Sequence, residues 1–194
     1  SGGLALCTAN LPDPGIDPAA GESPADYFNT VLYTGTGSSQ SVTGVGFAPD
    51  FVWIKERSSS SGHSLHDTVR GTNKRLDSSS GNDESASGVT AFGADGFTED
   101  GGGATGESSQ TYVSWNWLAG GSASTLSDGS INVSASVSAK SGFSILTYTG
   151  NATNGATIAH GLNSRPELVI FKNRSRDSRN WQTNFIDGTA RRSA

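Results

Sequence analysis

The histidines are the first residues of this chain to test for chemistry. His63 and His66 stand three residues apart in "GHSLHDTVRG", with Asp67 beside the second. Two histidines at this spacing can bind a metal ion from one face of a helix. They lie in a segment rich in Ser and Gly, with no third ligand close in the sequence. A structural turn is therefore the favoured interpretation, and no metal-binding residue is assigned.

Serine and phosphate chemistry have even less support. Ser58 to Ser61 form a run of serines, but no strained G-x-S-x-G turn presents a serine as a nucleophile. The stretch "GTGSS" at 35–39 lacks the lysine of a phosphate-binding loop and leads into a predicted strand, which favours a simple turn. The sequence therefore assigns no catalytic and no cofactor-binding residue.

Carboxylates give the remaining enzymatic hint. Asp95, Glu99 and Asp100 lie in "ADGFTEDGGG", and glycosidases use two carboxyl groups across the scissile bond. Acidic residues in a Gly-rich loop more often form turns or a loose Ca²⁺ site. The spacing departs from the calcium-loop pattern, because Phe97 stands where an oxygen ligand is needed. Turn formation is the favoured interpretation.

Tryptophans could serve a binding function, since aromatic faces stack on sugar rings. Trp53 lies inside an apolar run, and Trp115 is flanked at alternate positions by Val113 and Trp117, so these side chains are predicted to lie in the core. Trp181, in the polar run "RSRDSRNWQTN", is the tryptophan expected to be partly exposed.

Charge is distributed unevenly around Trp181. Residues 165–194 hold seven basic and three acidic residues, although the whole chain has a net charge of −5. Opposite charge on successive segments favours contacts between copies of a repeat or between subunits, and polyanions on a host surface could use the same patch. A solvated face is the simpler alternative. The candidate ligand or partner surface consists of Trp181, Arg174, Arg176 and Arg179.

Composition limits the fold and the partners. The chain of 194 residues has 26 glycines and only 16% charged residues, which favours an all-β protein rich in turns. Its acidic balance does not favour nucleic acid, and it has no apolar run long enough to span a membrane. Cys7 is the only cysteine, so a disulfide within the chain and a thiolate zinc site are excluded.

Two segments predict the strands that would position these residues. "DFVWIK" at 50–55 is apolar on both faces, as expected for a strand buried between two layers of a sandwich. In "TYVSWNW", Val113, Trp115 and Trp117 alternate with small or polar residues, as expected for a strand packed on that one side. Residues 1–27 contain Pro12, Pro14, Pro18 and Pro24 and are predicted to be an extended linker.

The sequence repeats itself. "FNTVLYTG" at 28–35 returns as "FSILTYTG" at 143–150, and "PDFVWIKERS" at 49–58 returns as "PELVIFKNRS" at 166–175. This predicts a tandem repeat of roughly 115 residues. The expected domains are a first β-sandwich repeat at 28–121, a Ser-rich connector at 122–142 and an incomplete second repeat at 143–194. The second copy has no equivalent of "YVSWNW", so we expect the chain to be a piece of a longer protein.

The order of these motifs carries a resemblance that covers almost the whole chain. "ALCTANLPDP", "YTGTG", "GFAPDFVWIKERS", "HSLHDTVRG", "GFTEDGG", "YVSWNWLAGG" and "GFSILTYTGN" together resemble a module of tail-fibre and related virion proteins of bacteriophages, notably marine ones. The resemblance implies a β-rich, jelly-roll or lectin-like sandwich located on the virion. It also implies homo-oligomers, usually trimers in such fibres.

The expected function is therefore that of a non-enzymatic virion module of a tail fibre or similar appendage. It would contact other virion proteins and attach to host-surface glycans, without a cofactor, nucleic acid or membrane. Two alternatives stay open. One is a purely structural connector or decoration protein of the virion, and the other is a glycan-cleaving virion enzyme.

Overall fold

The computed structural model describes residues 16–17, 20–176, 178–186 and 191–193. Within them the fold is all-β, as predicted, with antiparallel sheets and one turn of 3-10 helix, η3 (Pro24–Asp26). No helix in the described part of the chain has the length and hydrophobicity needed to cross a membrane. Most of the predicted linker, 1–27, lies outside the described residues.

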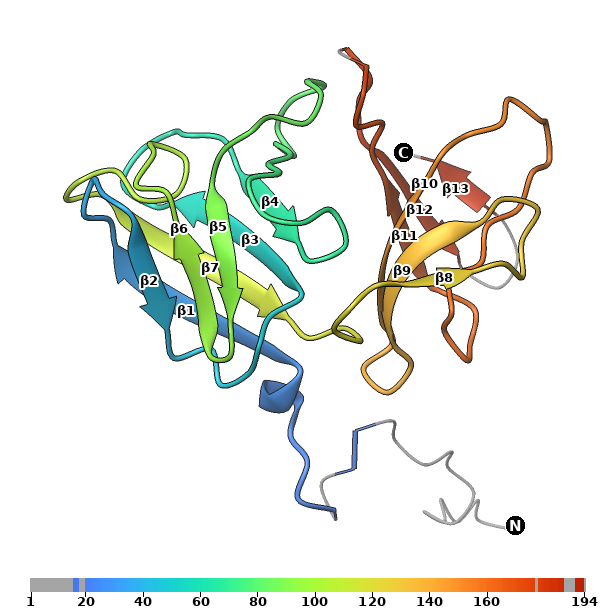
Figure 1. Ribbon diagram of the computed structural model, residues 1–194, viewed down its shortest axis with the longest axis horizontal. Helices are drawn as coiled ribbons and strands as arrows, with labels where there is room; N and C mark the ends of the chain where they lie inside the picture. The colour runs from blue at the N-terminus through green and yellow to red at the C-terminus, as the bar shows by residue number, and fades with distance from the viewer. Residues whose placement is uncertain (1–15, 18–19, 177, 187–190, 194) are drawn as a thin grey trace, which may run out of the picture.

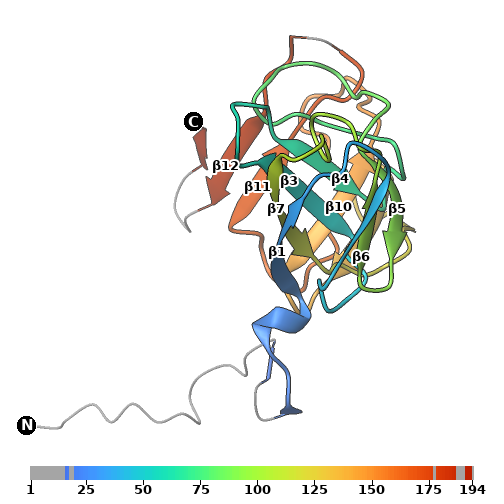
Figure 2. The same ribbon diagram turned by 90° about the vertical axis from the view of Figure 1, so that its left-hand side faces the viewer.

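The first unit is a sandwich of two antiparallel sheets (Figure 1). One sheet has the order β1-β7-β3-β4 and the other the order β2-β6-β5, and Figure 2 shows β5 and β6 lying to one side of β1, β3 and β7. The strands of the larger sheet are β1 (Phe28–Thr34), β7 (Thr111–Trp117), β3 (Phe51–Glu56) and β4 (Ser64–Asp67). Those of the smaller sheet are β2 (Gln40–Thr43), β6 (Gly96–Glu99) and β5 (Val89–Gly93).

The core of the first unit lies between these sheets. Because successive side chains of a strand point to opposite faces, Val52 and Ile54 of β3 turn inward together and are fully buried. Burial of side chains of this size contributes roughly 1.5–3 kcal/mol each. β3 is flanked by β7 and β4 within its sheet, but only one of its faces is fully buried, whereas its apolar sequence predicted burial on both. The buried core residues are Val42, Val52, Ile54, Val89, Phe97 and Tyr112.

The second unit has two three-stranded antiparallel sheets beside the first unit (Figure 1). Their orders are β10-β9-β8 and β11-β12-β13. The strands are β8 (Ser124–Leu126), β9 (Val133–Ser138), β10 (Phe143–Tyr148), β11 (Leu168–Phe171), β12 (Gln182–Ile186) and β13 (Arg191–Ser193).

The segment 122–142, which was predicted to be a Ser-rich connector, forms two strands in the structure. It contains β8 and β9, which pair with each other and, through β9, with β10. Val133, Ala135 and Val137 alternate with serines, and Val133 and Ala135 are buried. Alternation with period two, rather than serine content, determines the structure of this segment.

The repeated motifs form matching local structures. Both copies of the first motif are strands, β1 and β10, and both copies of the second are strands, β3 and β11. β3 forms an antiparallel pair with β4, with Phe51 opposite Asp67, and β11 forms one with β12, with Leu168 opposite Phe185. The units differ elsewhere, since β1 pairs with β7 whereas β10 pairs with β9. A repeat of the entire fold therefore stays a prediction.

Candidate ligand-binding face

Aromatic side chains gather on the outer face of the sheet β1-β7-β3-β4, the face turned away from the sandwich core. We call this surface the aromatic face and define it by Phe28, Phe51, Trp53, Trp115 and Trp117. The strand register places Trp115 opposite Trp53, and it places Trp117 between Phe28 and Phe51. The rings of Trp53 and Trp115 meet edge to face, with centroids 6.2 Å apart and planes at 80°. Their indoles are half-buried.

The orientation of β7 corrects the sequence prediction. Trp115, like Trp53, was expected in the core, but Tyr112, Ser114 and Asn116 point inward instead and are buried. The amide nitrogen of Asn116 finds partners there, since it donates to the carbonyl of Asn29 at 3.1 Å and to the Ser114 hydroxyl at 3.0 Å, whereas the Asn116 Oδ1 accepts no hydrogen bond from the described residues. Hydrogen bonds of this kind remove most of the penalty for burying polar groups. The indoles are thereby left on the outer face.

A histidine fixes one of the outward tryptophans. The Trp53 indole Nε1 donates to His63 Nδ1 at 2.7 Å. This bond requires an unprotonated Nδ1, and burial lowers the pKa of His63, which favours the neutral ring. The Trp53 ring is therefore held in one orientation on the aromatic face.

His63 and His66 do not come together, although their spacing suggested a metal site. His66 lies inside the sandwich, where its Nε2 and the hydroxyl of Ser64 are 2.8 Å apart, and both residues are buried. Burial lowers the pKa of His66 to about 3. Within the ranges that the structure describes, no group of three or more His, Cys, Asp or Glu residues could hold a metal ion.

The three carboxylates considered for catalysis or calcium binding each accept hydrogen bonds from backbone N–H groups. Glu99 and Asp100 also share one donor, the Thr105 hydroxyl, at 3.4 and 2.9 Å, and the three carboxylates hold the glycine-rich turns in place. Burial raises the pKa of Glu99, which is fully buried. The donors are Gly44 and Gly46 for Asp95, Gly101 for Glu99, and Gly88 and Gly102 for Asp100.

The predicted surface around Trp181 lies at the contact between the two units. Arg174 forms a bidentate ion pair with Glu84 of the first unit, with Nε–Oε2 and Nη2–Oε1 distances of 2.9 and 3.0 Å. The Trp181 indole donates to the carbonyl of Asp77 at 2.8 Å. Backbone bonds join Arg179 to Gly81 and Glu84 to Arg174. Arg176 and the Arg179 side chain are on the exposed surface.

Two residues of the candidate surface have a structural role within the chain. Arg174 and Trp181 are engaged with the loop of the first unit, so they hold the units together, and their role in binding a ligand stays a prediction. The attraction predicted between segments of opposite charge is present here as the Arg174–Glu84 pair.

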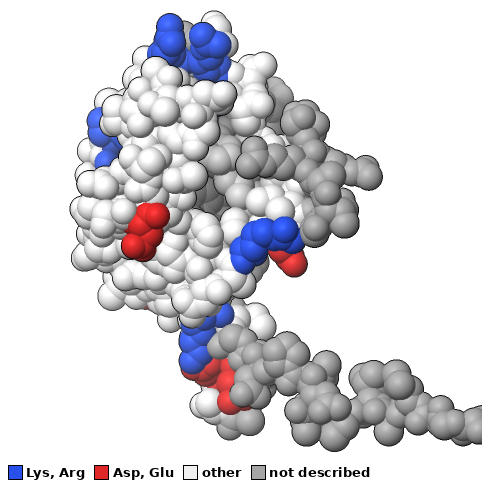
Figure 3. Space-filling view, turned by 90° about the vertical axis from the view of Figure 1, so that its right-hand side faces the viewer, with Lys and Arg blue, Asp and Glu red and all other residues white. Residues whose placement is uncertain are grey.

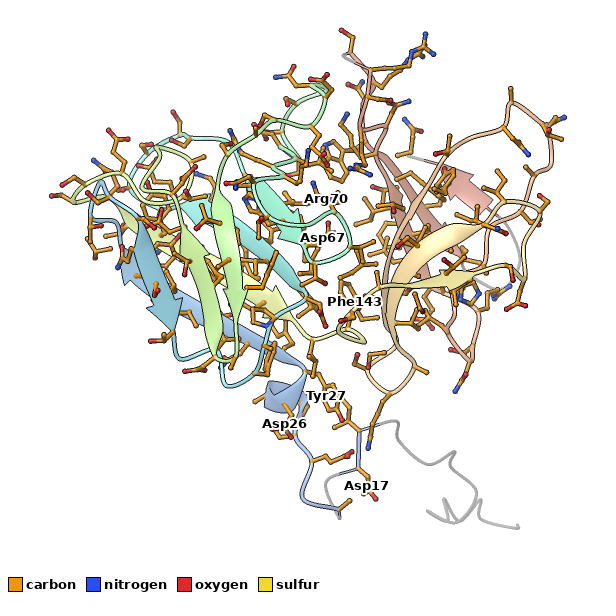
Figure 4. The ribbon with its side chains drawn as sticks, in the orientation of Figure 1. Asp17, Asp26, Tyr27, Asp67, Arg70 and Phe143 are labelled. Carbon is orange, nitrogen blue, oxygen red and sulfur yellow. The ribbon has the colours of Figure 1, made fainter. Side chains whose placement is uncertain are left out.

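Behind this pair lies a buried charge network that the sequence did not reveal. Arg70 donates through Nε to Asp67 Oδ2 at 2.5 Å and through Nη1 to Glu84 Oε2 at 3.2 Å (Figure 4). Glu84 is therefore shared between Arg70 and Arg174. Burial opposes its ionisation, but the hydrogen bonds from the two guanidinium groups leave its pKa below the ordinary value. No sequence signal links Asp67, Glu84 and Arg174, which come from three separate segments.

A second contact between the units is apolar. Phe143 of β10 packs against Trp117 and Phe51, with ring centroids 5.9 Å from each, and Figure 4 places it in the space between the units. Nearby, the Gly120 N–H donates to the Ser136 hydroxyl at 2.9 Å. The sequence repeat aligns Phe143 with Phe28, a residue of the aromatic face.

Charged groups are scattered on the side of the second unit. Figure 3 shows this face as largely uncharged, with separate basic and acidic groups rather than a continuous patch. The surface agrees with the low content of charged residues, 16%. Recognition on such a surface would depend on aromatic stacking and hydroxyl groups more than on charge.

Comparison with known proteins identifies a family. No curated protein and no solved structure matches the chain. Residues 23–189 match a family described as a domain of unknown function, DUF7483, and these residues include every strand described above except β13. The chain belongs to the DUF7483 family.

Proposed function

We propose that this chain is a non-enzymatic module of a phage tail fibre or similar virion appendage, which contacts host-surface glycans through the aromatic face. The virion assignment is supported by the resemblance of the ordered motifs from "YTGTG" to "GFSILTYTGN". The observation that carries glycan binding is the pair of half-buried indoles, Trp53 and Trp115, side by side on a rigid sheet.

The geometry of this pair suits a sugar ring. Aromatic rings offer a large flat apolar surface, and the hydrogen bond from Trp53 to His63 removes much of the rotational freedom of the Trp53 side chain. Preorganised groups lose less conformational entropy on binding, so a fixed indole binds more tightly than a mobile one. The hydroxyl of Thr30, opposite Trp115 in the register, is an adjacent polar group for sugar hydroxyls.

A glycan array probed with the chain 1–194 tests the proposal. We expect binding to a restricted set of glycans, and we expect Trp115→Ala to weaken it by roughly fivefold or more, since stacked aromatic contacts contribute on the order of a kcal/mol or more. Tyr148→Ala removes an exposed aromatic side chain elsewhere and should leave binding unchanged. Circular dichroism would check that each variant is folded. An array with no bound glycan, or equal losses in both variants, would reject the glycan-binding face.

The connector function is the second candidate, because the exposed apolar side chains of Leu168 and Ile170 suit a protein partner better than a sugar. We propose other virion proteins as partners, with homo-oligomers, usually trimers, as the resemblance implies. Light scattering of the chain alone measures this oligomeric state. A glycan-cleaving enzyme would release reducing ends from host polysaccharide, and such release by the purified chain would displace the non-enzymatic proposal.

A further inference from the structure

Two strands of the second unit each have an open edge. β10 ends the sheet β10-β9-β8, and β11 ends the sheet β11-β12-β13. Among the described residues, each of these strands is paired on one side only. An open strand edge presents N–H and C=O groups that can pair with another extended chain.

The corresponding strands of the first unit show what such an edge can accept. β10 and β11 carry the second copies of the motifs that form β1 and β3. In the first unit, β7 lies between β1 and β3 and pairs with both. The second unit thus contains the equivalents of the two strands that flank β7, and its described residues include no strand equivalent to β7 itself.

The pairing of β7 with β1 and β3 also predicts the register in which an added strand would pair with β10 and β11. Trp117 of β7 lies opposite Phe28 and Phe51, and the repeat places Phe143 and Leu168 at these two positions. Two residues along, Trp115 lies opposite Thr30 and Trp53, whose equivalents are Ile145 and Ile170. An added strand in this register would place its two aromatic side chains beside Leu168 and Ile170.

These two side chains are uncovered in the second unit. Leu168 is 47% exposed and Ile170 is 49% exposed, and strand alternation puts both on one face of β11. Their equivalents in the first unit, Phe51 and Trp53, are flanked by Trp117 and Trp115 and are half-buried. Aromatic residues at the positions of Trp117 and Trp115 in a strand like β7 would therefore cover Leu168 and Ile170.

We propose that β10 and β11 together form an acceptor for one added β-strand of the β7 type, an extended segment in which large aromatic residues alternate with small or polar ones. Pairing with both edges would provide affinity, and aromatic contacts with Leu168 and Ile170 would provide specificity, as in other cases of strand addition. The partner is another polypeptide segment of this pattern, because β7 itself is held in the centre of its own sheet. The acceptor is independent of the glycan-binding proposal.

A labelled peptide with the sequence of residues 108–120, "SSQTYVSWNWLAG", is the probe. We expect saturable one-to-one binding to the chain 1–194 by fluorescence anisotropy, with slowed hydrogen exchange in both β10 and β11. The same peptide carrying Val113→Pro and Trp115→Pro should not bind, since proline cannot donate a ladder hydrogen bond. Absence of saturable binding by the unmodified peptide would overturn the proposal, as would protection confined to β1 and β3, where the peptide would have replaced β7.

Two surface variants of the chain locate the contact. Ile170→Lys should weaken peptide binding by roughly tenfold or more, because the charged group would lie under an aromatic side chain of the added strand. Phe185→Lys is the matched control: Phe185 is 58% exposed and lies on β12, on the far side of β11 from the open edge. It should change binding by about twofold or less. Equal losses in the two variants would show general adhesion to an apolar surface and would overturn the proposal.

Discussion

The ring of Phe143 stacks on the indole of Trp117, with centroids 5.9 Å apart and planes inclined by 21°. The two residues belong to different units, and Phe51 meets the same phenylalanine edge to face at 5.9 Å. The row of aromatic residues on the first unit is thus continued by a side chain of the second. This contact couples the stability of the units, since neither ring can be exposed without uncovering the other.

Replacing Phe143 with alanine should therefore destabilise the protein. We expect a loss of about 1–3 kcal/mol in the free energy of unfolding, less than for a fully buried phenylalanine because the ring is half-buried. Urea denaturation followed by tryptophan fluorescence measures the loss. Tyr148→Ala, an exposed aromatic position on the same strand, should cost about 0.5 kcal/mol or less. Equal stability of the two variants would contradict the coupling.

Asp50 should also stabilise the segment that leads from the first unit to the second. Its buried carboxylate accepts hydrogen bonds from the N–H groups of Ala119 and Gly121, at 2.8 and 3.0 Å, and from the Thr68 hydroxyl at 3.0 Å. Asp50→Ala leaves these donors without a partner, so we expect a loss of about 2–3 kcal/mol in thermal or urea unfolding.

Asp95→Ala is the matched control for this variant. Asp95 also accepts two backbone N–H bonds, but it is exposed, and water can replace its carboxylate. Its loss should be about 1 kcal/mol or less. If Asp95→Ala lowers the free energy of unfolding as much as Asp50→Ala does, burial of the Asp50 carboxylate is not the reason for its contribution to stability.

The sequence predicted the class of the fold better than the direction of its side chains. Glycine content and alternating strands correctly indicated antiparallel β-structure. Alternation shows which residues share a face but not which face turns inward. That choice in β7 depends on Asn29, which is 87 residues from Asn116 in the chain and accepts its hydrogen bond. Such distant partners leave no trace in local spacing.

The candidate site shows the same limit. The uneven charge predicted contacts between repeat copies or subunits, and the structure shows one ion pair of this kind within the chain, between Arg174 and Glu84. The partner of Arg174 could not be chosen from sequence, because Glu84 is 90 residues away and several other carboxylates lie in the first unit. Trp181, expected to be available for a ligand, instead donates to a backbone carbonyl across the junction. Our proposal therefore rests on Trp53 and Trp115, which the sequence assigned to the core and the structure leaves half-buried.

Gly88 should tolerate no side chain. Its φ is +93°, and a Cβ at this position would lie 2.2 Å from Cε1 of His66, a ring that is itself buried. We expect Gly88→Ala to cost roughly 3–5 kcal/mol, from backbone strain together with overpacking. Gly44→Ala isolates the strain, since Gly44 has a φ of +89° and open space around its Cβ position, and it should cost about 1–2 kcal/mol.

A double-mutant cycle assigns the remaining cost to the His66 ring. In a chain already carrying His66→Ala, the substitution Gly88→Ala should cost no more than Gly44→Ala does, because the clashing ring is gone. Urea unfolding of the four chains gives the coupling energy. An undiminished cost in the His66→Ala background would mean that backbone strain alone makes Gly88 necessary.

The ion pair between Arg174 and Glu84 should make the junction sensitive to acid. The pKa of Glu84 is lowered in the folded protein, so its contribution to stability is present above the unfolded value, near 4.5, and is lost as the pH falls through the lower folded value. Because the Arg174 side chain is 40% exposed, a coupling energy of only about 0.5–1.5 kcal/mol is expected at pH 7. A double-mutant cycle of Arg174→Gln, Glu84→Gln and the double variant measures this coupling energy and removes the separate contribution of Arg70.

The coupling energy should decline steadily below pH 4.5 and vanish once Glu84 is protonated. The control Arg176→Gln, at an exposed position, should leave stability unchanged at every pH. A coupling energy that persists at full strength in acid would show that packing, not charge, joins these two segments.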